Sequence, residues 1–322
     1  MKKLFPFFAM AVMLFTASCS NENIKAGCEN EALVSFAVAL DGQAATRAIS
    51  DGKSVNLLTY SVYAVDGQGN LGQKLTGVEG KKVTFPCTET IRLAKNKSYK
   101  IVFWAQAEDC KAYTVDAETM KVAINYEGVN NDENRDAFFK VIDLDVNDAM
   151  EVDVELRRPF AQLNVGVIKE DWDAAVSTGV IVEQSTVTIS SVADGLNLVT
   201  GEVTASAAVE NGITYSLNDI PTEMLYADVN EDGVKESYYW ISMSYLLVND
   251  QDKQGLASAL VDAEFSFTSE SKPIALKVTS VPVQRNWRTN ILGQILTGTI
   301  NFNVFIDETF DNDYNYPSTS KE

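Results

Sequence analysis

The stretch ALVSFAVAL, residues 32–40, decides the fold because its side chains alternate between two faces. The more apolar face carries Val34, Phe36, Val38 and Leu40. A period of two is typical of a β-strand with one buried face, whereas an amphipathic helix repeats every 3.6 residues. We therefore predict a half-buried strand at this point of the chain.

The same period recurs along the chain, with turns rich in Gly, Asn and Asp between the segments. An earlier series comprises LTYSVYAV (58–65), KKVTFPCTETIRL (81–93), KSYKIVFWAQ (98–107) and AMEVDVELRR (149–158). A later series comprises RRPFAQLNVGV (157–167), STVTISSV (185–192), SYYWISMSYLLV (237–248), AEFSFTS (263–269), IALKVTSVPV (274–283) and TINFNVFID (299–307). A short helix is expected at 170–178. The pattern predicts an all-β protein with two tandem β-sandwich domains.

These features predict a division of the chain into five parts. Residues 1–18 have the pattern of a lipoprotein signal peptide, with a basic start, an apolar stretch and small residues before Cys19. The apolar stretch is shorter than the roughly 20 residues that span a bilayer. The expected parts are a signal peptide at 1–18, a tether at 19–31, sandwiches at 32–156 and 157–307, and a polar acidic tail at 308–322. We expect lipid on Cys19; the alternative is an ordinary secretory signal with an incidental cysteine.

Composition excludes several classes of function. The formal net charge is -19, and such a field repels phosphate backbones, so nucleic acid is not an expected partner. The chain has no histidine, which excludes Ser-His-Asp triads and His-ligated metals. No pair of carboxylates stands out for glycoside hydrolysis. We expect no enzyme activity and no cofactor.

Three weaker candidates remain. Asp228, Asn230 and Asp232 have the spacing of half an EF-hand loop, but the twelfth position is Tyr239 and not glutamate, so a hairpin turn is favoured over a metal site. Cys87 and Cys110 flank an expected hairpin; they either pair or remain buried thiols. In SYYWISMSY (237–245), the alternation favours a strand with one buried face over an aromatic platform for sugars.

Several segments of the sequence, taken together, resemble those of a known protein family. They are the region around Cys19, ATRAISDG followed by LTYSVYAVD, YKIVFWAQ, RRPFAQLNVGV, LNLVTGEV (196–203) and VPVQRNWRTNILGQILTG (281–298). With them the chain resembles the fimbrillin family of Bacteroidales, surface lipoproteins that build or decorate type V pili. The resemblance implies transthyretin-like sandwiches, an outer-membrane location on the cell surface, cleavage by an arginine-specific protease and assembly by donor-strand exchange.

Arg47 is the expected processing site. It lies among small residues in QAATRAISDG (43–52), with no other basic residue between Lys25 and Lys53. A connection of this composition is expected to be exposed, so a protease would cut between Arg47 and Ala48 without unfolding the protein. The alternative is an ordinary solvated loop residue. After cleavage, residues 32–40 would be held by noncovalent contacts alone and would become the displaced strand.

The segment from about residue 299 is a candidate donor strand. Ile300, Phe302, Val304 and Ile306 repeat the order of side-chain types on the apolar face of residues 32–40. Added strands bind through backbone hydrogen bonds, and alternate side chains set their register. The alternative is that this segment closes the second sandwich.

The sequence therefore predicts a fimbrillin-like pilus subunit or adhesin. Its expected partners are copies of itself, other pilus subunits, an arginine-specific protease and the outer membrane through lipid on Cys19. The alternative is a non-polymerising surface lipoprotein that binds a carbohydrate or host ligand, or a pilus anchor that retains its lipid.

Overall fold

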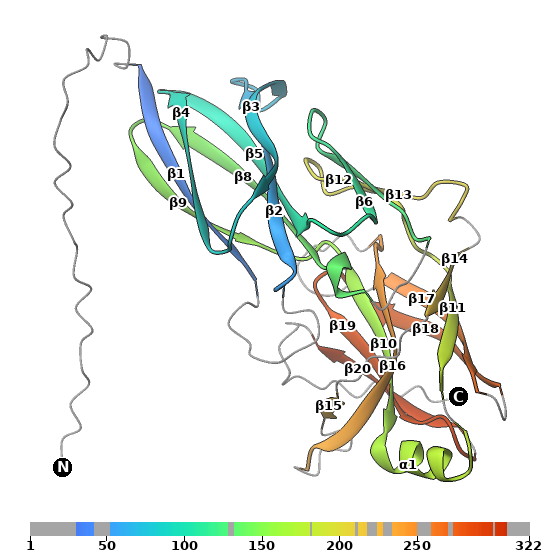
Figure 1. Ribbon diagram of the computed structural model, residues 1–322. Coiled ribbons are helices and arrows are strands. Elements are labelled where there is room, and N and C mark those ends of the chain that lie inside the picture. The colour runs from blue at the N-terminus through green and yellow to red at the C-terminus, as the bar shows by residue number, and fades with distance from the viewer. Residues whose placement is uncertain are drawn as a thin grey trace, which may run out of the picture.

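The computed structural model describes residues 30–41, 52–127, 132–180, 182–209, 212–217, 224–227, 234–249, 259–269, 273–298 and 300–307. These residues form two β-rich lobes that meet end to end in an elongated molecule (Figure 1). Apart from one small sheet to which both halves of the chain contribute, strands before residue 157 build one lobe and strands after residue 160 build the other. The prediction of an all-β protein with two sandwiches is confirmed.

The N-terminal sandwich packs a three-stranded sheet against a four-stranded sheet. The first sheet has the order β4-β1-β9, with β4 (Cys87–Ala94), β1 (Glu31–Leu40) and β9 (Met150–Leu156). The second has the order β3-β2-β5-β8, with β3 (Leu71–Lys82), β2 (Val55–Val65), β5 (Lys97–Ala107) and β8 (Ala137–Val146). Buried side chains of both sheets form one core.

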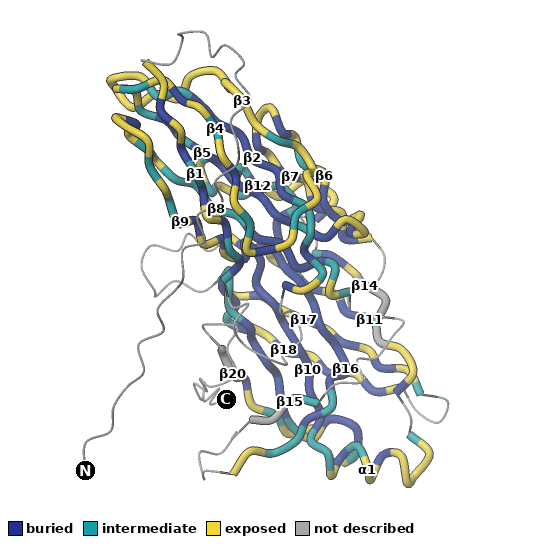
Figure 2. The backbone as a smooth tube through the Cα atoms, turned by 60° about the vertical axis from the view of Figure 1, so that its left-hand side comes forward, coloured by how far each residue is buried: buried dark blue, intermediate teal, exposed yellow. Residues whose placement is uncertain are grey.

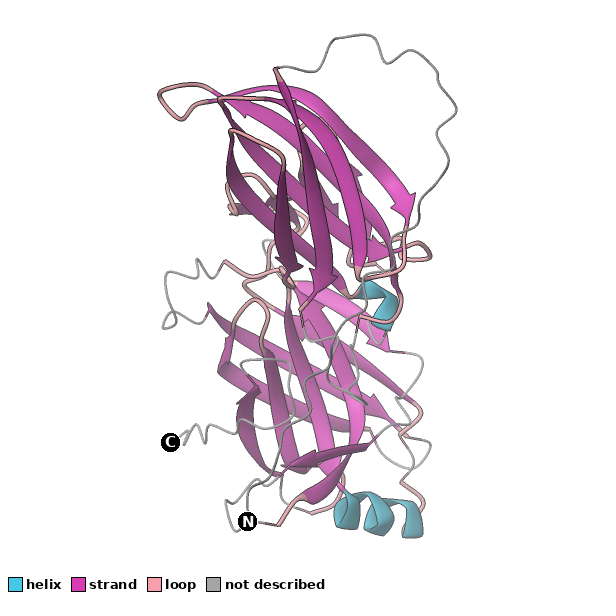
Figure 3. Ribbon diagram, turned by 90° about the vertical axis from the view of Figure 1, so that its left-hand side faces the viewer, coloured by secondary structure: helices cyan, strands magenta, loops and turns pink. Residues whose placement is uncertain are grey.

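The C-terminal sandwich is built in the same way from a five-stranded and a four-stranded sheet. The five-stranded sheet has the order β15 (Met224–Ala227), β16 (Glu236–Leu246), β10 (Ala161–Ile168), β19 (Arg288–Gln294) and β20 (Asn301–Asp307). The four-stranded sheet has the order β14 (Ile213–Leu217), β11 (Gln184–Ile189), β17 (Ala259–Thr268) and β18 (Ile274–Val283). Helix α1 (Lys169–Ser177), expected at 170–178, lies at the far end of this lobe (Figures 1 and 3).

A fifth, small sheet, the bridging sheet, joins the two halves of the chain. Its order is β13 (Val203–Thr204), β12 (Gly195–Asn197), β7 (Lys121–Ile124) and β6 (Tyr113–Asp116). The pairing of Leu196 with Val122 thus connects the second half of the chain to the first. The two sandwiches are consequently not independent bodies joined by one linker.

The core of the C-terminal lobe extends into this junction. Trp104, Tyr113 and Phe160 pack on one another, with ring centroids 5.1–6.4 Å apart. They belong to the same buried cluster as the centre of the C-terminal sandwich, and buried residues continue from one lobe into the other (Figure 2). The hydroxyl of Tyr126 donates to the carbonyl of Ala193 at 2.6 Å. Burial of apolar area therefore holds the lobes together.

A buried ion pair completes the junction. Arg158, between β9 and β10, donates from Nε and Nη2 to the two carboxylate oxygens of Asp136 at 2.8 and 2.9 Å. Both side chains are at most 2% exposed. The guanidinium also lies 4.3 Å from the centroid of the Phe138 ring. Burial raises the pKa of Asp136, and the charge and hydrogen bonds of Arg158 act in the opposite direction.

Two segments differ from their sequence-based interpretation. The expected strand at 81–93 is split: β3 ends at Lys82 and β4 begins at Cys87, in a different sheet. Pro86, which has no N–H to give to a ladder, precedes β4. In β16 both faces are buried from Ile241 to Leu246, because this strand also contributes to the core at the junction. No helix within the described ranges is long and apolar enough to span a membrane.

The junction ion pair yields a testable expectation. Replacing Arg158 with methionine leaves the Asp136 carboxylate buried without its partner, so the free energy of unfolding should fall by about 3–5 kcal/mol. The matched control is Lys100→Met, which removes a pair whose partner Asp143 is 75% exposed; its cost should stay below about 1 kcal/mol. Urea denaturation measures both. Equal losses of unfolding free energy in the two variants would contradict the expectation that the buried pair stabilises the fold more than an exposed pair does.

Candidate assembly site

Strand β1 occupies the centre of the three-stranded sheet. It pairs with β4 in antiparallel register, with Phe36 opposite Glu89, and with β9 in parallel register, with Phe36 opposite Val152. Strands β4 and β9 are not neighbours in this sheet, so β1 alone connects them. Without β1, both flanking strands would present unpaired backbone N–H and C=O groups.

The side chains of β1 that face the second sheet are fully packed. Val34, Phe36 and Val38 are 0% exposed, and Leu40 is 4% exposed. The Phe36 ring meets the Phe103 ring of β5 edge to face, with 5.5 Å between centroids. On the opposite face Leu33 is 42% exposed. The burial alternates as the sequence pattern indicates.

The magnitude of this burial explains why the slot must be occupied. Burial of four apolar side chains at about 1.5–3 kcal/mol each contributes on the order of 6–12 kcal/mol, as an upper estimate. A whole domain has a net stability of about 5–15 kcal/mol. Loss of β1 would therefore remove most of the stability of the N-terminal sandwich unless another strand entered the slot.

The C-terminal end of β1 is fastened to the junction. The N–H of Asp41 donates to the carbonyl of Leu156 at 2.8 Å, which extends the pairing with β9. The Asp41 carboxylate accepts from Asn286 Nδ2 at 3.1 Å and lies 3.7 Å from Arg157 Nε. Sequence reasoning missed this contact because a single aspartate after a strand resembles an ordinary turn residue.

Several residues singled out from the sequence lie outside the described residues. These are Cys19, Arg47, Ala48, Asp228, Asn230 and Asp232. Lipidation, cleavage and the half EF-hand therefore stay predictions. Within the described ranges, no three metal-ligating side chains gather into a cluster.

The candidate donor segment forms an edge strand. Strand β20 pairs with β19 alone in the described sheet, with Val304 opposite Ile291. Val304 is 7% exposed and Phe302 is half-buried against the C-terminal core, whereas Ile300 is 39% exposed. Ile306 lies in β20 opposite Thr289. In this structure the segment closes the C-terminal sandwich, and its other edge has no described partner strand.

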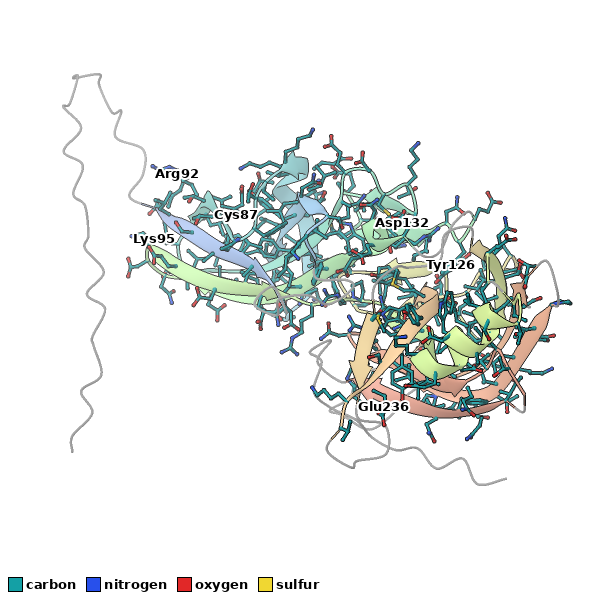
Figure 4. The ribbon with its side chains drawn as sticks, turned by 60° about the horizontal axis from the view of Figure 1, so that its bottom comes forward. Cys87, Arg92, Lys95, Tyr126, Asp132 and Glu236 are labelled. Atoms are coloured by element: carbon teal, nitrogen blue, oxygen red, sulfur yellow. The ribbon has the colours of Figure 1, made fainter. Side chains whose placement is uncertain are left out.

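Cys87 and Cys110 are both free thiols. Cys87 begins β4 on the N-terminal lobe (Figure 4). It lies opposite Val38 of β1 in the antiparallel register. Cys110 belongs to the buried cluster at the junction. Burial raises the pKa of both thiols, which disfavours the reactive thiolate at neutral pH.

Comparison with known proteins places the chain in a family. The sequence profile of one family matches residues 26–321. The chain belongs to DUF6562, a family of unknown function. No curated protein matches this DUF6562 chain.

Solved structures are distantly similar to this DUF6562 protein. A candidate polysaccharide-binding protein of Bacteroides thetaiotaomicron has 11% identity and a TM-score of 0.47, over 86% of this chain and 96% of that one. A fimbrial assembly protein of Parabacteroides distasonis has 15% identity and a TM-score of 0.42, over 88% and 97%. The fimbrial anchor protein Mfa2 of Porphyromonas gingivalis has 12% identity and a TM-score of 0.41, over 89% and 100%. No function follows from likenesses this weak.

The packing of β1 can be tested by truncation. Phe36→Ala should lower the free energy of unfolding by about 3–5 kcal/mol, because the lost ring leaves a cavity opposite Phe103. The control is Leu33→Ala. Leu33 is next to the buried Val34 in the sequence but lies on the outer face of β1, so this variant should change the free energy of unfolding by no more than about 0.5 kcal/mol. Urea denaturation followed by circular dichroism distinguishes them. A mild Phe36→Ala variant would mean that β1 adds little to the core.

Proposed function

We propose that this protein is a cell-surface subunit of a fimbria-like assembly, or an adhesin built on the same plan, in which β1 is a removable strand. The observation that carries the proposal is the position of β1. It is the first described strand of the chain, it lies between two strands that do not pair with each other, and its inner face is fully buried.

The topology favours departure of β1 over that of any inner strand. Only the connection from Asp41 to β2 joins β1 to the rest of the described chain. A cut after Arg47 would sever that connection, and β1 could then leave without any other strand unthreading. The slot that remains would have two open edges and an apolar floor, which is the kind of site that β-strand addition fills.

The proposed sequence of events follows from these features. The chain is exported and lipidated on Cys19, an arginine-specific protease cuts between Arg47 and Ala48, and a strand of another copy or another subunit enters the slot. The segment 299–307 is the candidate donor because β20 is an edge strand with the required alternation. A subunit that kept its lipid and its β1 would instead serve as an anchor.

Controlled proteolysis tests the proposal. The purified precursor treated with an arginine-specific protease should yield a chain that begins at Ala48 and, with time, SDS-resistant ladders in unheated gel samples. Arg47→Lys keeps the charge but removes the cleavage site, so neither product should form. The matched control Arg92→Lys changes an exposed arginine of β4 and should be processed and assembled normally.

A peptide separates strand exchange from other forms of association. Excess synthetic peptide of residues 31–41 should refill the slot and suppress the ladders, because it carries the whole of β1. A peptide of the same composition in scrambled order should not. Trimmed protein that stays monomeric without any peptide would contradict assembly and favour a non-polymerising, ligand-binding surface protein.

A further inference from the structure

Four segments line an open pocket of about 430 Å³ where the two sandwiches meet. They are part of β8, the connection from β9 to β10, the turn between β12 and β13, and the turn between β18 and β19. Both lobes therefore contribute to its walls. The volume lies within the roughly 300–1,000 Å³ of small-molecule sites.

The charge of the pocket wall is opposite to that of the protein. The lining includes Lys140, Arg157, Arg158 and Arg285 and no carboxylate. The chain has 45 acidic and 26 basic residues, so a wall of average composition would carry more acids than bases. A concave, positively lined surface concentrates the field and attracts anions.

The four cations do not contribute equally. Arg158 is neutralised by Asp136. Arg285 donates to the backbone carbonyls of Val248 at 3.3 Å and Gly201 at 3.0 Å. These carbonyls orient the guanidinium at the pocket, and because they carry no formal charge they leave the positive charge of Arg285 uncompensated. The Arg157 side chain is 60% exposed, and the Asp41 carboxylate, 3.7 Å from Arg157 Nε, compensates its positive charge in part. Together with Lys140, the wall keeps a positive excess.

The remaining wall suits a ring with hydroxyl groups. Trp287 contributes an aromatic surface, and the negative face of an aromatic ring attracts the weakly positive C–H groups of a pyranose. Gln284 is 4% exposed, and its Oε1 has no hydrogen-bond partner among the described residues. Such a buried acceptor is satisfied when a ligand hydroxyl donates to it.

We propose that this junction pocket binds an acidic saccharide, with its carboxylate at Lys140, Arg157 and Arg285 and a pyranose ring against Trp287. The chemistry of the wall selects this class over a neutral sugar, which leaves the positive excess uncompensated, and over a bare anion, which leaves Trp287 and Gln284 unused. The inference does not depend on strand exchange, because the pocket is present with β1 in place.

The first experiment compares matched sugars on the full precursor by isothermal titration calorimetry at low salt. Digalacturonate and N-acetylneuraminic acid are the acidic probes, and galactobiose with the same linkage is the neutral counterpart of the first. At least one acidic probe should bind saturably, at least about tenfold more tightly than galactobiose, a difference of about 1.4 kcal/mol. Absence of binding by both acidic probes would overturn the proposal, as would equal affinity for galactobiose.

Two further probes distinguish the class of ligand. Inorganic sulfate should bind more weakly than the better acidic sugar, and so should a short poly-glutamate peptide. Sulfate of equal affinity would mean an anion site that does not recognise sugars. A peptide of equal affinity that competes for the pocket would mean a site for protein carboxylates. Either result would overturn the saccharide assignment.

Charge variants assign the binding to this pocket. Lys140→Gln should weaken binding of the acidic probe about tenfold, a loss of about 1.4 kcal/mol, because it removes a charged hydrogen-bond donor from the carboxylate. Asp41→Asn removes the carboxylate beside Arg157 and should strengthen binding severalfold, a direction that a merely structural role would not produce. Lys277→Gln, on an exposed lysine of β18 outside the pocket, should leave affinity unchanged. Unchanged affinity in both Lys140→Gln and Asp41→Asn would place the site elsewhere and overturn the proposal.

Discussion

The N-terminal sandwich depends on the seating of β1 between β4 and β9. Those two strands come from distant parts of the sequence and are hydrogen-bonded to β1 and not to each other. The same strand supplies Phe36 to the centre of the core, against Phe103. One segment thus completes both the hydrogen-bond ladder and the apolar packing. Because β1 is also the first described strand, the element on which the sheet most depends is the one whose removal requires the least rearrangement of the chain.

The end of this strand is linked to the region that holds the lobes together. Asp41 bonds to Asn286 in the turn between β18 and β19, and it lies beside Arg157 in the connection between the sandwiches. The adjacent Arg158 is buried against Asp136. The bridging sheet and the packed rings of Trp104, Tyr113 and Phe160 lie in the same region. The seating of β1 is therefore fixed by contacts from both lobes, although its side chains fill only the N-terminal core.

Strict alternation made part of this fold predictable. The period-two pattern of β1 indicated both its strand character and its buried face, and β17 shows an equally regular burial pattern. The bridging sheet gave no such signal, because strands of two to four residues are too short to show a period. The pairing of the strands could not be predicted either, because alternation shows which face of a strand is buried but not which other strand lies next to it. The Arg158–Asp136 pair could not be recognised because charged residues are usually exposed, and only tertiary packing shows that these two are buried.

The polar character of the junction has a physical origin in the turns that meet there. Each sandwich buries its apolar faces internally, but the turns between strands carry backbone carbonyls that need donors. Arginine suits this task because one guanidinium offers five N–H groups. Arg285 donates to the carbonyls of Val248 and Gly201, and Arg158 reaches the carbonyl of Asp41 at 3.5 Å as well as Asp136. The carbonyls that accept from Arg285 leave its charge uncancelled, whereas Asp136 neutralises Arg158. Arginine that satisfies turn carbonyls at such a junction therefore gives it a positive wall even in a strongly acidic protein.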